Sequence, residues 1–536
     1  MPSILHTAVA LTGLLSQVPG VAAALYDTVI DTKYGPVQGY PAFNSSPSSA
    51  NLSNWKDITV WKGIPFAANT GGQNRWKAPQ PAKRWNDTLD AREFGNICPS
   101  STSGAAGYTV DEDCLNLNIW SAAKNSNAKL PVVMWSYPAY STAAMPTFNG
   151  EGMADKGVVY VNYNYRTGPL GWMAHPDLSR EFEAVTGHNS SGNWGMLDQF
   201  AALKWIHENI AAFGGDPDHI TVMGQSAGSA ATQHIVNSPL TKGLIVGAII
   251  ESGVRDPHDP LCAEVAENYR TLDWAVNQGV KYLASKNVSS IAQARKLPMN
   301  DLVESSQFSL GSSADWVFTA TLDYYAIPDT YENSLRKGAA NDVPIITGNA
   351  RDENDAVYGL NITVLQYLEN LNSTFGAKFG QKFLALYPAT TSAEASAAQN
   401  LQYTERSKIG TWRWANKWRE SAKSPVWTYL WDHAPPGQSQ GAFHMSEIPY
   451  VLNNLYGVDA YPWTEEDYHI AATMNAYWVN FIKTGNPNGK GLVQWDRNDL
   501  QDLNTQELGG GWGKTRLGSK SRLELFAEWF KTLPAY

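Results

Sequence analysis

Short apolar runs recur at wide spacing along the chain and predict buried strands. Each run is rich in β-branched or aromatic residues and ends near Gly, Pro, Asn or Asp, which is typical of a strand covered on both faces. These runs are residues 130–135, 158–163, 220–223, 247–250, 343–347 and 426–431.

Helical patterns lie between the strand runs. After residue 198, apolar residues recur at helical spacing and line one helix face, until Gly214-Gly215 predicts the end of that helix. Because strands alternate with helices, we expect an α/β fold with a mostly parallel central sheet and helices on both faces. The apolar residues of this helix are Leu203, Ile206, Ile210 and Phe213.

The length of the chain leaves the number of domains open. At roughly 150 residues per domain, 536 residues would make three or four domains. No internal repeat, charge block or Pro-rich linker divides the sequence, however. We therefore expect one α/β domain over residues 25–536, with long insertions.

Composition and charge exclude several other classes of protein. Charged residues make up only 17% and aromatic residues 12%, so the chain can build a large core and disorder is excluded. The net charge of −10 argues against nucleic-acid binding, which needs a basic surface. Three cysteines are too few for a disulfide framework or a Cys₄ zinc site. We expect neither a metal nor a cofactor.

The N-terminus has the pattern of a targeting segment. Residues 4–15 are a short apolar run, and Ala22-Ala23-Ala24 follows as a small-residue cleavage site. This pattern is typical of a secretory signal peptide, and a buried N-terminal helix is the alternative. The run is too short to cross a bilayer comfortably, and no apolar run of about 18 residues follows it. We expect residues 1–24 to be removed and the mature chain to be secreted and soluble.

N-x-S/T sequons support a secretory route only weakly, because chance alone would supply nearly as many. They are consistent with glycosylation of the secreted chain. The seven asparagines are Asn44, Asn51, Asn86, Asn189, Asn287, Asn361 and Asn372.

Residues 224–228 read Gly-Gln-Ser-Ala-Gly, a G-x-S-x-G pattern centred on Ser226. The pattern follows an apolar strand run and precedes an Ala-rich helical stretch, which is the arrangement of a nucleophile elbow. Glycines permit the sharp turn, and the N-terminus of the next helix can stabilise an oxyanion. We therefore predict that Ser226 is a nucleophile; a tight structural turn is the alternative.

A serine nucleophile needs a histidine base, which lies towards the end of the chain in this type of fold. His433 follows a predicted strand, His444 lies in a loop-like segment, and His469 falls in a predicted helix over residues 465–484. A loop between strand and helix favours His444, although position alone does not separate it from His433.

The orienting acid lies between the serine and the histidine in the chain. Asp352, Glu353 and Asp355 all follow the predicted strand at residues 343–347. Any one of them can also be an ordinary solvated charge, so the residues alone leave the acid open.

Longer motifs resemble those of the type-B carboxylesterase/lipase family of α/β-hydrolases, including its fungal secreted carboxylesterases. They keep the family order from about Val60 to Asp496, which is nearly the whole mature chain. The matching segments are WKGIPFA at residues 61–67, EDCLNLN at 112–118, NYR at 164–166, GNWGMLDQ at 192–199, FGGDP at 213–217 and ESG at 251–253.

The resemblance implies which residues complete the catalytic triad. The family acid is the Glu of Gly-x-x-x-Asp-Glu-Gly, and residues 348–354 match with Asn354 in place of the last Gly, which implies Glu353. The family base lies in Gly-Ala-x-His, and residues 441–444 match with Met445 where Gly is usual, which implies His444. His444 would take the Ser226 proton, Glu353 would stabilise the imidazolium, and an acyl-enzyme would form.

The oxyanion segment departs from the family pattern. Relatives have a Gly-rich motif after the strand at residues 130–135, whereas this chain has Tyr137-Pro138-Ala139-Tyr140. The resemblance makes Ala139, Tyr140 and Ala227 the oxyanion-hole donors. We expect the hole to survive with an altered shape, and Tyr140 to narrow the acyl pocket. A catalytically weak or silent binding protein on the same fold is the alternative.

Gln225 is a second departure, because many relatives carry Glu at this position. A neutral amide removes one negative charge beside the nucleophile and so weakens attraction for cationic esters. We therefore expect neutral, hydrophobic small esters as substrates, such as a secondary-metabolite ester or lactone. A peptidase or thioesterase on the same fold is a lesser option, and the oligomeric state stays open.

The resemblance also implies structural pairs. Cys98 and Cys114 match the first disulfide of the family, and Cys262 is left without a partner. The short loop between Cys98 and Cys114 favours soluble esters over interfacial lipolysis. By the same analogy, Arg75 is expected to pair with Glu112, and Arg166 with Asp198.

Overall fold

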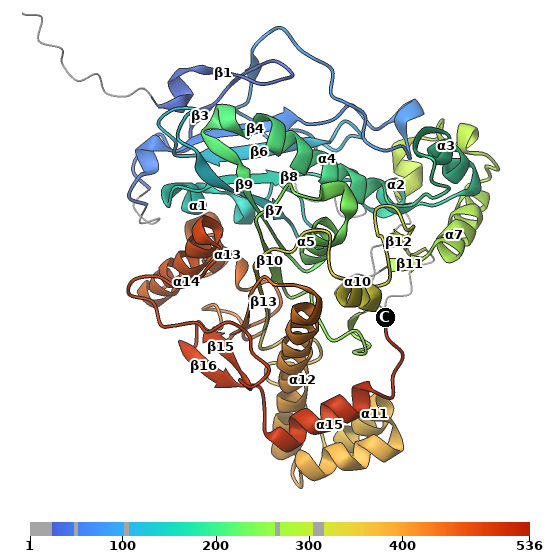
Figure 1. Cartoon of the computed structure of the whole chain (residues 1–536), viewed down its shortest axis with the longest axis vertical. Coiled ribbons are helices and arrows are strands. Elements are labelled where there is room, and N and C mark those ends of the chain that lie inside the picture. The colour runs from blue at the N-terminus through green and yellow to red at the C-terminus, as the bar shows by residue number, and fades with distance from the viewer. Residues whose placement is uncertain (1–23, 48–51, 101–106, 263–268, 304–315) are drawn as a thin grey trace, which may run out of the picture.

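A computed structural model describes residues 24–47, 52–100, 107–262, 269–303 and 316–536 (Figure 1). In these ranges, eleven strands form one sheet. Their spatial order is β16 (Gly513–Arg516), β15 (Asn504–Leu508), β14 (Val426–Trp431), β13 (Ile345–Ala350), β10 (Gly247–Glu251), β9 (Gly215–Gln225), β7 (Leu130–Ser136), β8 (Val159–Tyr163), β6 (Asn116–Ser121), β4 (Thr59–Pro65) and β3 (Tyr40–Pro41).

The centre of this sheet is parallel, as the strand–helix alternation predicted. Neighbours from β15 through β8 pair in parallel, whereas the pairs at the two edges are antiparallel. All six predicted strand runs are strands of this sheet, which confirms the α/β fold. Two small sheets join β1 (Val29–Asp31), β2 (Pro36–Gln38) and β5 (Leu89–Asp90), and β11 (Tyr269–Thr271) and β12 (Ala320–Leu322).

Helices follow most of the parallel strands. The α-helices are α1 (Glu151–Asp155), α2 (Gly168–Trp172), α3 (Pro176–Thr186), α4 (Trp194–Asn209), α5 (Ala227–Asn237), α7 (Leu272–Ser285), α8 (Ile291–Ala294), α9 (Met299–Val303), α10 (Tyr331–Lys337), α11 (Val364–Leu386), α12 (Ser392–Ser421), α13 (Ile448–Val451), α14 (Glu465–Thr484) and α15 (Lys520–Phe530). Short 3₁₀ turns are η1 (Leu25–Asp27), η2 (Trp55–Asp57), η3 (Gly72–Asn74), η5 (Pro146–Phe148), η6 (Ile210–Phe213), η7 (Pro239–Thr241) and η8 (Leu455–Gly457).

The helix predicted to end at Gly214-Gly215 is α4, which continues as η6. Gly214 has φ 80° and caps η6 in the left-handed conformation, as expected of a terminating glycine. The helix predicted over residues 465–484 is α14. Both predicted helices are therefore present, and the first ends at the glycines that predicted its end.

The sheet is covered on both faces. Trp478 of α14 packs edge-on against Tyr429 of β14, with ring centroids 5.5 Å apart. Asn349 of β13 points to the other face, where its amide donates to Thr411 of α12 at 2.6 Å. In Figure 1, α11, α12 and α15 form a lobe at the lower end of the molecule. This lobe has an aromatic core of its own, which includes Phe375, Phe383, Phe526 and Trp529.

The predicted structural pairs are present. A disulfide joins Cys98 to Cys114, and Cys262 is buried with a free thiol. Two buried ion pairs link segments that precede Ser226 in the chain. Arg75 lies 2.5 Å from Glu112, and Arg166 lies 2.7 Å from Asp198.

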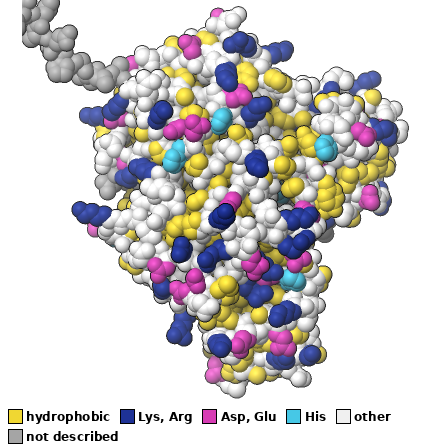
Figure 2. Space-filling view, viewed as in Figure 1, with side chains coloured by type: hydrophobic (Ala, Val, Ile, Leu, Met, Phe, Trp, Pro, Cys, Tyr) yellow, Lys and Arg dark blue, Asp and Glu magenta, His cyan; other side chains and the backbone are white. Residues whose placement is uncertain are grey.

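The residues of the predicted signal peptide lie outside the described part of the chain, except for Ala24. Among the described residues, no helix is both long and apolar enough to cross a membrane. Side chains of both charges are interspersed over the face seen in Figure 2. Asn51 lies outside the described ranges, and the other six sequon asparagines are all exposed.

Candidate active site

Ser226 lies in a sharp turn between β9 and α5. Its backbone angles are φ 56° and ψ −117°, which a residue with a side chain rarely adopts. The turn is tight: a Cβ on Gly224 would lie 2.2 Å from the Gly228 carbonyl oxygen, and one on Gly228 would lie 1.9 Å from that of Ser136. Glycine is therefore required on both sides of the serine, as in a nucleophile elbow.

Glu353 lies just after β13 and is 5% exposed. The backbone N–H of Ala350 donates to Oε1 of Glu353 at 3.1 Å, which fixes the carboxylate from behind. The other oxygen, Oε2, accepts from Nδ1 of His444 at 2.6 Å. The structure thus brings together the acid and the base that the family resemblance selected.

The Glu353 carboxylate also alters the acidity of His444. Burial favours the neutral imidazole, but the hydrogen bond from Nδ1 and the negative charge of Glu353 outweigh it. The net result is that the pKa of His444 lies above its ordinary value. A base with a raised pKa accepts a proton more readily, which suits it to deprotonate a hydroxyl.

Asp352, one of the alternatives for the acid, has a structural role. Its Oδ2 accepts from the Ala442 N–H at 2.7 Å, and its backbone pairs with Phe443. Arg351 donates to the same carboxylate at 2.7 Å. Asp352 therefore ties the segment that carries Glu353 to the segment that carries His444.

The other two histidines have different surroundings. Nε2 of His433 lies 2.8 Å from Oδ1 of Asp467, which also accepts from the Tyr450 hydroxyl at 2.7 Å. His469 is exposed on α14, as its helical position predicted. In the described part of the chain, neither His433 nor His469 forms a hydrogen bond or an ion pair with Glu353.

No hydrogen bond joins Ser226 to His444 in the described part of the chain. The Gln225 side-chain nitrogen instead lies 3.4 Å from both Nδ1 and Nε2 of the His444 ring. Because Gln225 directly precedes Ser226, the His444 ring lies beside the elbow, but it forms no hydrogen bond with the Ser226 hydroxyl. Such loose geometry is common before substrate binds.

The three residues predicted as oxyanion donors lie around the ends of two neighbouring strands. Ala139 and Tyr140 form a turn after β7, and Ala227 opens α5, where its N–H has no acceptor within the helix. Tyr140 has φ 60°, and its side chain is 59% exposed. This exposure gives no support to the prediction that Tyr140 narrows the acyl pocket.

Tyr137 belongs to the core. Its ring is buried and stacks on Tyr165 at a centroid distance of 4.7 Å. The Tyr165 hydroxyl donates to the Tyr137 carbonyl at 3.2 Å. Of the two tyrosines in this segment, Tyr137 therefore lies in the core and Tyr140 lies on the surface.

Three of the residues that replace family glycines share one backbone feature. Tyr140, Asn354 and Met445 have φ of 60°, 56° and 80°, all in the left-handed region that favours glycine. Each non-glycine residue there costs about 1 kcal/mol or more of strain, with Asn tolerated best. The loops that carry these three residues thus have the backbone angles typical of glycine at positions where the residue is not glycine.

Sequence reasoning missed one prominent acid near the triad. Glu447 follows His444 by three residues, is fully buried, and acts electrostatically on that histidine. Its spacing from His444 within a matched family segment was the available signal. Glu251, at the end of β10, is also fully buried and carried no predicted role.

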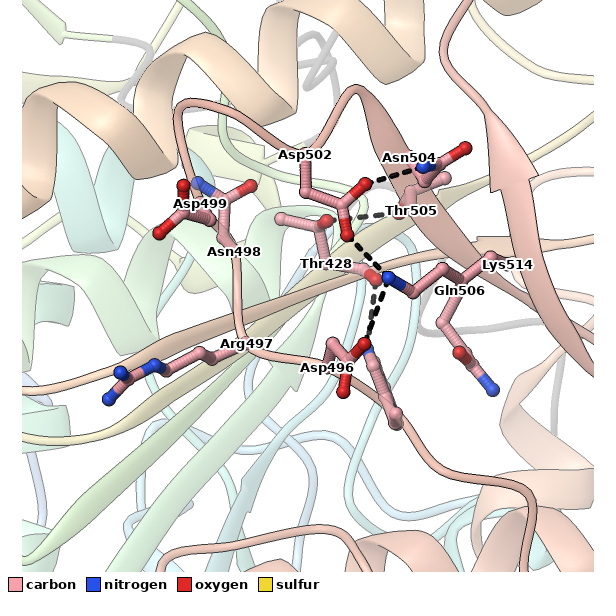
Figure 3. A pocket seen from close by; sticks show the side chains of 11 residues that line it. Thr428, Asp496, Arg497, Asn498, Asp499, Asp502, Asn504, Thr505, Gln506 and Lys514 are labelled. Atoms are coloured by element: carbon pink, nitrogen blue, oxygen red, sulfur yellow. Dashed lines mark hydrogen bonds and ion pairs between the residues drawn. The ribbon is translucent and has the colours of Figure 1, made fainter.

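One hollow lies apart from the predicted triad. A surface pocket beside β14 and β15 is spanned by Lys514, which binds Asp496 at 2.9 Å and Asp502 at 2.7 Å (Figure 3). It contains none of the predicted catalytic residues. In the described ranges, no group of three or more His, Cys, Asp or Glu side chains is placed to hold a metal ion.

Sequence comparison identifies the family. The carboxylesterase family profile matches residues 26–516. The chain is 34% identical over 466 residues to a fumonisin B1 esterase from Sphingopyxis macrogoltabida, covering 82% of each chain. It is 31% identical over 492 residues to a para-nitrobenzyl esterase from Bacillus subtilis, covering 87% of this chain and 92% of that one.

Solved structures agree with the sequence matches. A PNB esterase superposes with a TM-score of 0.72 at 28% identity, covering 93% of this chain and 99% of the other. A carboxylesterase from Geobacillus stearothermophilus gives a TM-score of 0.74 at 25% identity, covering 93% and 100%. The chain therefore belongs to the carboxylesterase family of α/β-hydrolases and is a carboxylic ester hydrolase.

Proposed function

We propose that the chain hydrolyses carboxylic esters through Ser226, His444 and Glu353. His444 removes the Ser226 proton as the serine oxygen attacks the ester carbonyl, and Glu353 stabilises the resulting imidazolium. The imidazolium then protonates the departing alcohol, which leaves an acyl-enzyme. Water, deprotonated by His444, cleaves this intermediate and releases the acid. The observation that carries the proposal is the 2.6 Å hydrogen bond between His444 and Glu353 beside a strained serine.

Closure of His444 onto Ser226 is the movement this mechanism needs. The weak 3.4 Å contacts to Gln225 hold the ring beside the serine and are easily exchanged for a hydrogen bond to its hydroxyl. The N–H groups of Ala139, Tyr140 and Ala227 then stabilise the negative oxygen of the tetrahedral intermediate.

The substrates we propose are neutral, hydrophobic small esters, including secondary-metabolite esters or lactones. Gln225 is buried and uncharged beside the nucleophile, so nothing at this position attracts a cationic leaving group. Similar proteins named for fumonisin B1 and para-nitrobenzyl esters support a small-molecule substrate.

The second candidate is a catalytically weak or silent binding protein on the same fold. Tyr140 favours this candidate, because a tyrosine with φ 60° is a strained residue within the predicted oxyanion segment. If its N–H is misaimed, the loss of one donor costs about 3–4 kcal/mol of transition-state stabilisation.

We also propose that the chain is secreted after removal of residues 1–24 and is glycosylated. Exposure of Asn44, Asn86, Asn189, Asn287, Asn361 and Asn372 supports this, because a glycan needs an accessible acceptor. N-terminal sequencing and glycosidase treatment of the protein from culture medium test it: an intact N-terminus, or no change in mass, would contradict it.

Turnover of p-nitrophenyl esters of increasing acyl length tests the catalytic proposal. We expect measurable hydrolysis that is lost in Ser226→Ala, and low activity on butyrylcholine relative to an uncharged ester of the same acyl chain. No turnover on any short ester would favour the silent protein. A strong preference for the choline ester would refute the proposed substrate class.

A further inference from the structure

Four paired residues form one row across strands β9, β10, β13 and β14, the strands that lead to the proposed triad. Gln225 of β9 pairs with Glu251 of β10, and Glu251 pairs with Gly348 of β13. Gly348 in turn pairs with Tyr429 of β14. Because these strands are parallel and in register, the four positions face the same side of the sheet, which α14 covers.

Gly348 has no side chain, which leaves room in this row for the Tyr429 ring on the side of Glu251. A Cβ on Gly348 would lie 2.4 Å from the Tyr429 ring, so the ring lies across the glycine. Trp478 packs against the same ring and donates from its indole N–H to Oε1 of Glu251 at 2.8 Å. Trp478 of α14 therefore contacts both Tyr429 and Glu251 on this face of the sheet.

A second buried acid, Glu447, lies in the loop that carries His444 and is close enough for the charge of Glu251 to act on it. Glu447 and Glu251 are each 0% exposed. Neither Glu447 oxygen has a hydrogen-bond partner among the described residues, nor has Oε2 of Glu251, the Ser252 hydroxyl or the Tyr429 hydroxyl. Buried polar atoms are normally paired, so these carboxyl oxygens and hydroxyls are expected to share protons within the interior.

The two acids have no salt-bridge partner among the described residues. The charge of His444 lowers the pKa of Glu447, and Arg255, which acts electrostatically on His444, donates to the Ser407 hydroxyl at 3.1 Å. Neither Glu251 nor Glu447 forms an ion pair within 4.0 Å with a described Lys, Arg or His. Two buried carboxylates without a counter-ion cannot both stay charged, so at least one holds a proton at neutral pH.

The acidity of both groups agrees with this geometry. Burial is the main cause that raises the pKa of each carboxyl to about 8, and the charges of Glu251 and Glu353 contribute to the rise for Glu447. The titratable groups facing Glu447 are Glu251 from β10, Tyr429 from β14, Glu353 after β13 and His444 from its own loop. Tyr160 of β8 also interacts electrostatically with Glu251.

We propose that Glu251 and Glu447 form a proton-holding acid pair, which releases its proton to solvent at mildly alkaline pH and then strengthens His444 as a base. The released proton leaves one additional negative charge beside the imidazole. Because His444 becomes positively charged as it deprotonates Ser226, this charge stabilises the transition state. Both residues are positioning residues that act through His444, so the inference rests on the proposed function.

The pH dependence of kcat/KM between pH 5 and 10 tests the pair, with a p-nitrophenyl ester and the Ser226→Ala rate subtracted. We expect two rising steps in the wild-type chain, one from His444 and a second near pH 8. The second step is expected to be about tenfold, equivalent to about 1.4 kcal/mol. Glu447→Gln and Glu251→Gln should each remove the second step and keep the first.

Glu151→Gln is the matched control. Glu151 is also a buried carboxyl whose pKa is raised by burial, but it contacts Tyr456 and does not act on His444. Its variant should keep both steps. A single step in the wild-type chain, two steps in either pair variant, or one step in Glu151→Gln would overturn the proposal.

Infrared titration of the wild-type chain separates this inference from the proposed function. The band of protonated carboxyl groups should disappear as pH rises through about 8, and part of that loss should be missing in whichever pair variant folds. An inactive wild-type chain that shows this loss would refute the proposed function and support the acid pair. An active chain without it would refute the acid pair alone.

Discussion

The Glu353 carboxylate and Nδ1 of His444 are 2.6 Å apart, although 91 positions separate the two residues in the chain. They lie in the loops after β13 and β14, which are neighbouring parallel strands. The carboxyl ends of such strands meet at one edge of the sheet, where ligands bind in open α/β folds. Strand order therefore brings acid and base together.

Replacing the acid should disable the base without unfolding the chain. Glu353→Gln keeps the size of the side chain but removes the charge that orients and stabilises the imidazolium. We expect kcat for a p-nitrophenyl ester to fall by about 10⁴. Glu369→Gln, at an exposed position on α11, is the control and should leave kcat unchanged. A loss of less than tenfold in Glu353→Gln would assign the acid elsewhere.

Activity should decline on the acid side with a midpoint above about pH 6.5, the ordinary value for histidine. The neutral imidazole is the base, and Glu353 raises the pKa of His444, so protonation begins at a higher pH. In Glu353→Gln the midpoint of the residual activity should move to lower pH. The protonated His444–Glu353 pair stabilises the fold below pH 6.5, and this contribution is lost as pH rises through the folded-state pKa. A wild-type midpoint well below pH 6.5 would contradict the raised value.

A methyl group at the elbow should be poorly tolerated. The Cβ of Gly228→Ala would lie 1.9 Å from the Ser136 carbonyl oxygen, so β7 and α5 would have to separate. We expect a loss of about 3 kcal/mol in the free energy of unfolding, measured by urea denaturation. Gly410→Ala in α12 is the control, because its Cβ would meet the nearest atom at 3.5 Å. It should be neutral or gain up to about 1 kcal/mol. Equal losses in both variants would refute the steric argument.

The Cys98–Cys114 disulfide should stabilise the fold by closing a short loop. The sequence separation is 16, and a loop of this length contributes about 3 kcal/mol by restricting the unfolded chain. The double variant Cys98→Ala/Cys114→Ala should lose about that much in urea denaturation. A reducing agent should destabilise the wild-type chain and leave the double variant unaffected. An unchanged denaturation midpoint in the double variant would show that the loop is already ordered without the bond.

Most of the fold could be predicted from the sequence because its central strands are buried on both faces. Such strands read as continuous apolar runs, and the run at residues 426–431 coincides with β14. The order of the strands could not be read, because pairing depends on contacts between distant segments. Nothing in the apolar runs states that β10 lies between β9 and β13.

The candidate site was predicted in part from residues and in part from resemblance. Gly224 and Gly228 signalled the elbow through a local requirement for space. Asp352 and Glu353 are adjacent acids that the residues alone did not separate, whereas the family resemblance selected Glu353. Their contacts differ accordingly: Asp352 binds the Ala442 backbone and Glu353 binds His444. Glu447 was missed because burial of an acid comes from the tertiary fold, and its spacing from His444 was the one signal in the sequence.

The left-handed angles at Tyr140, Asn354 and Met445 carry a consequence for how such enzymes are recognised. A search that demands glycine at these three sites would discard this chain, although its backbone there adopts the left-handed angles that favour glycine. Each of the three side chains adds surface beside the proposed triad that a glycine would not supply.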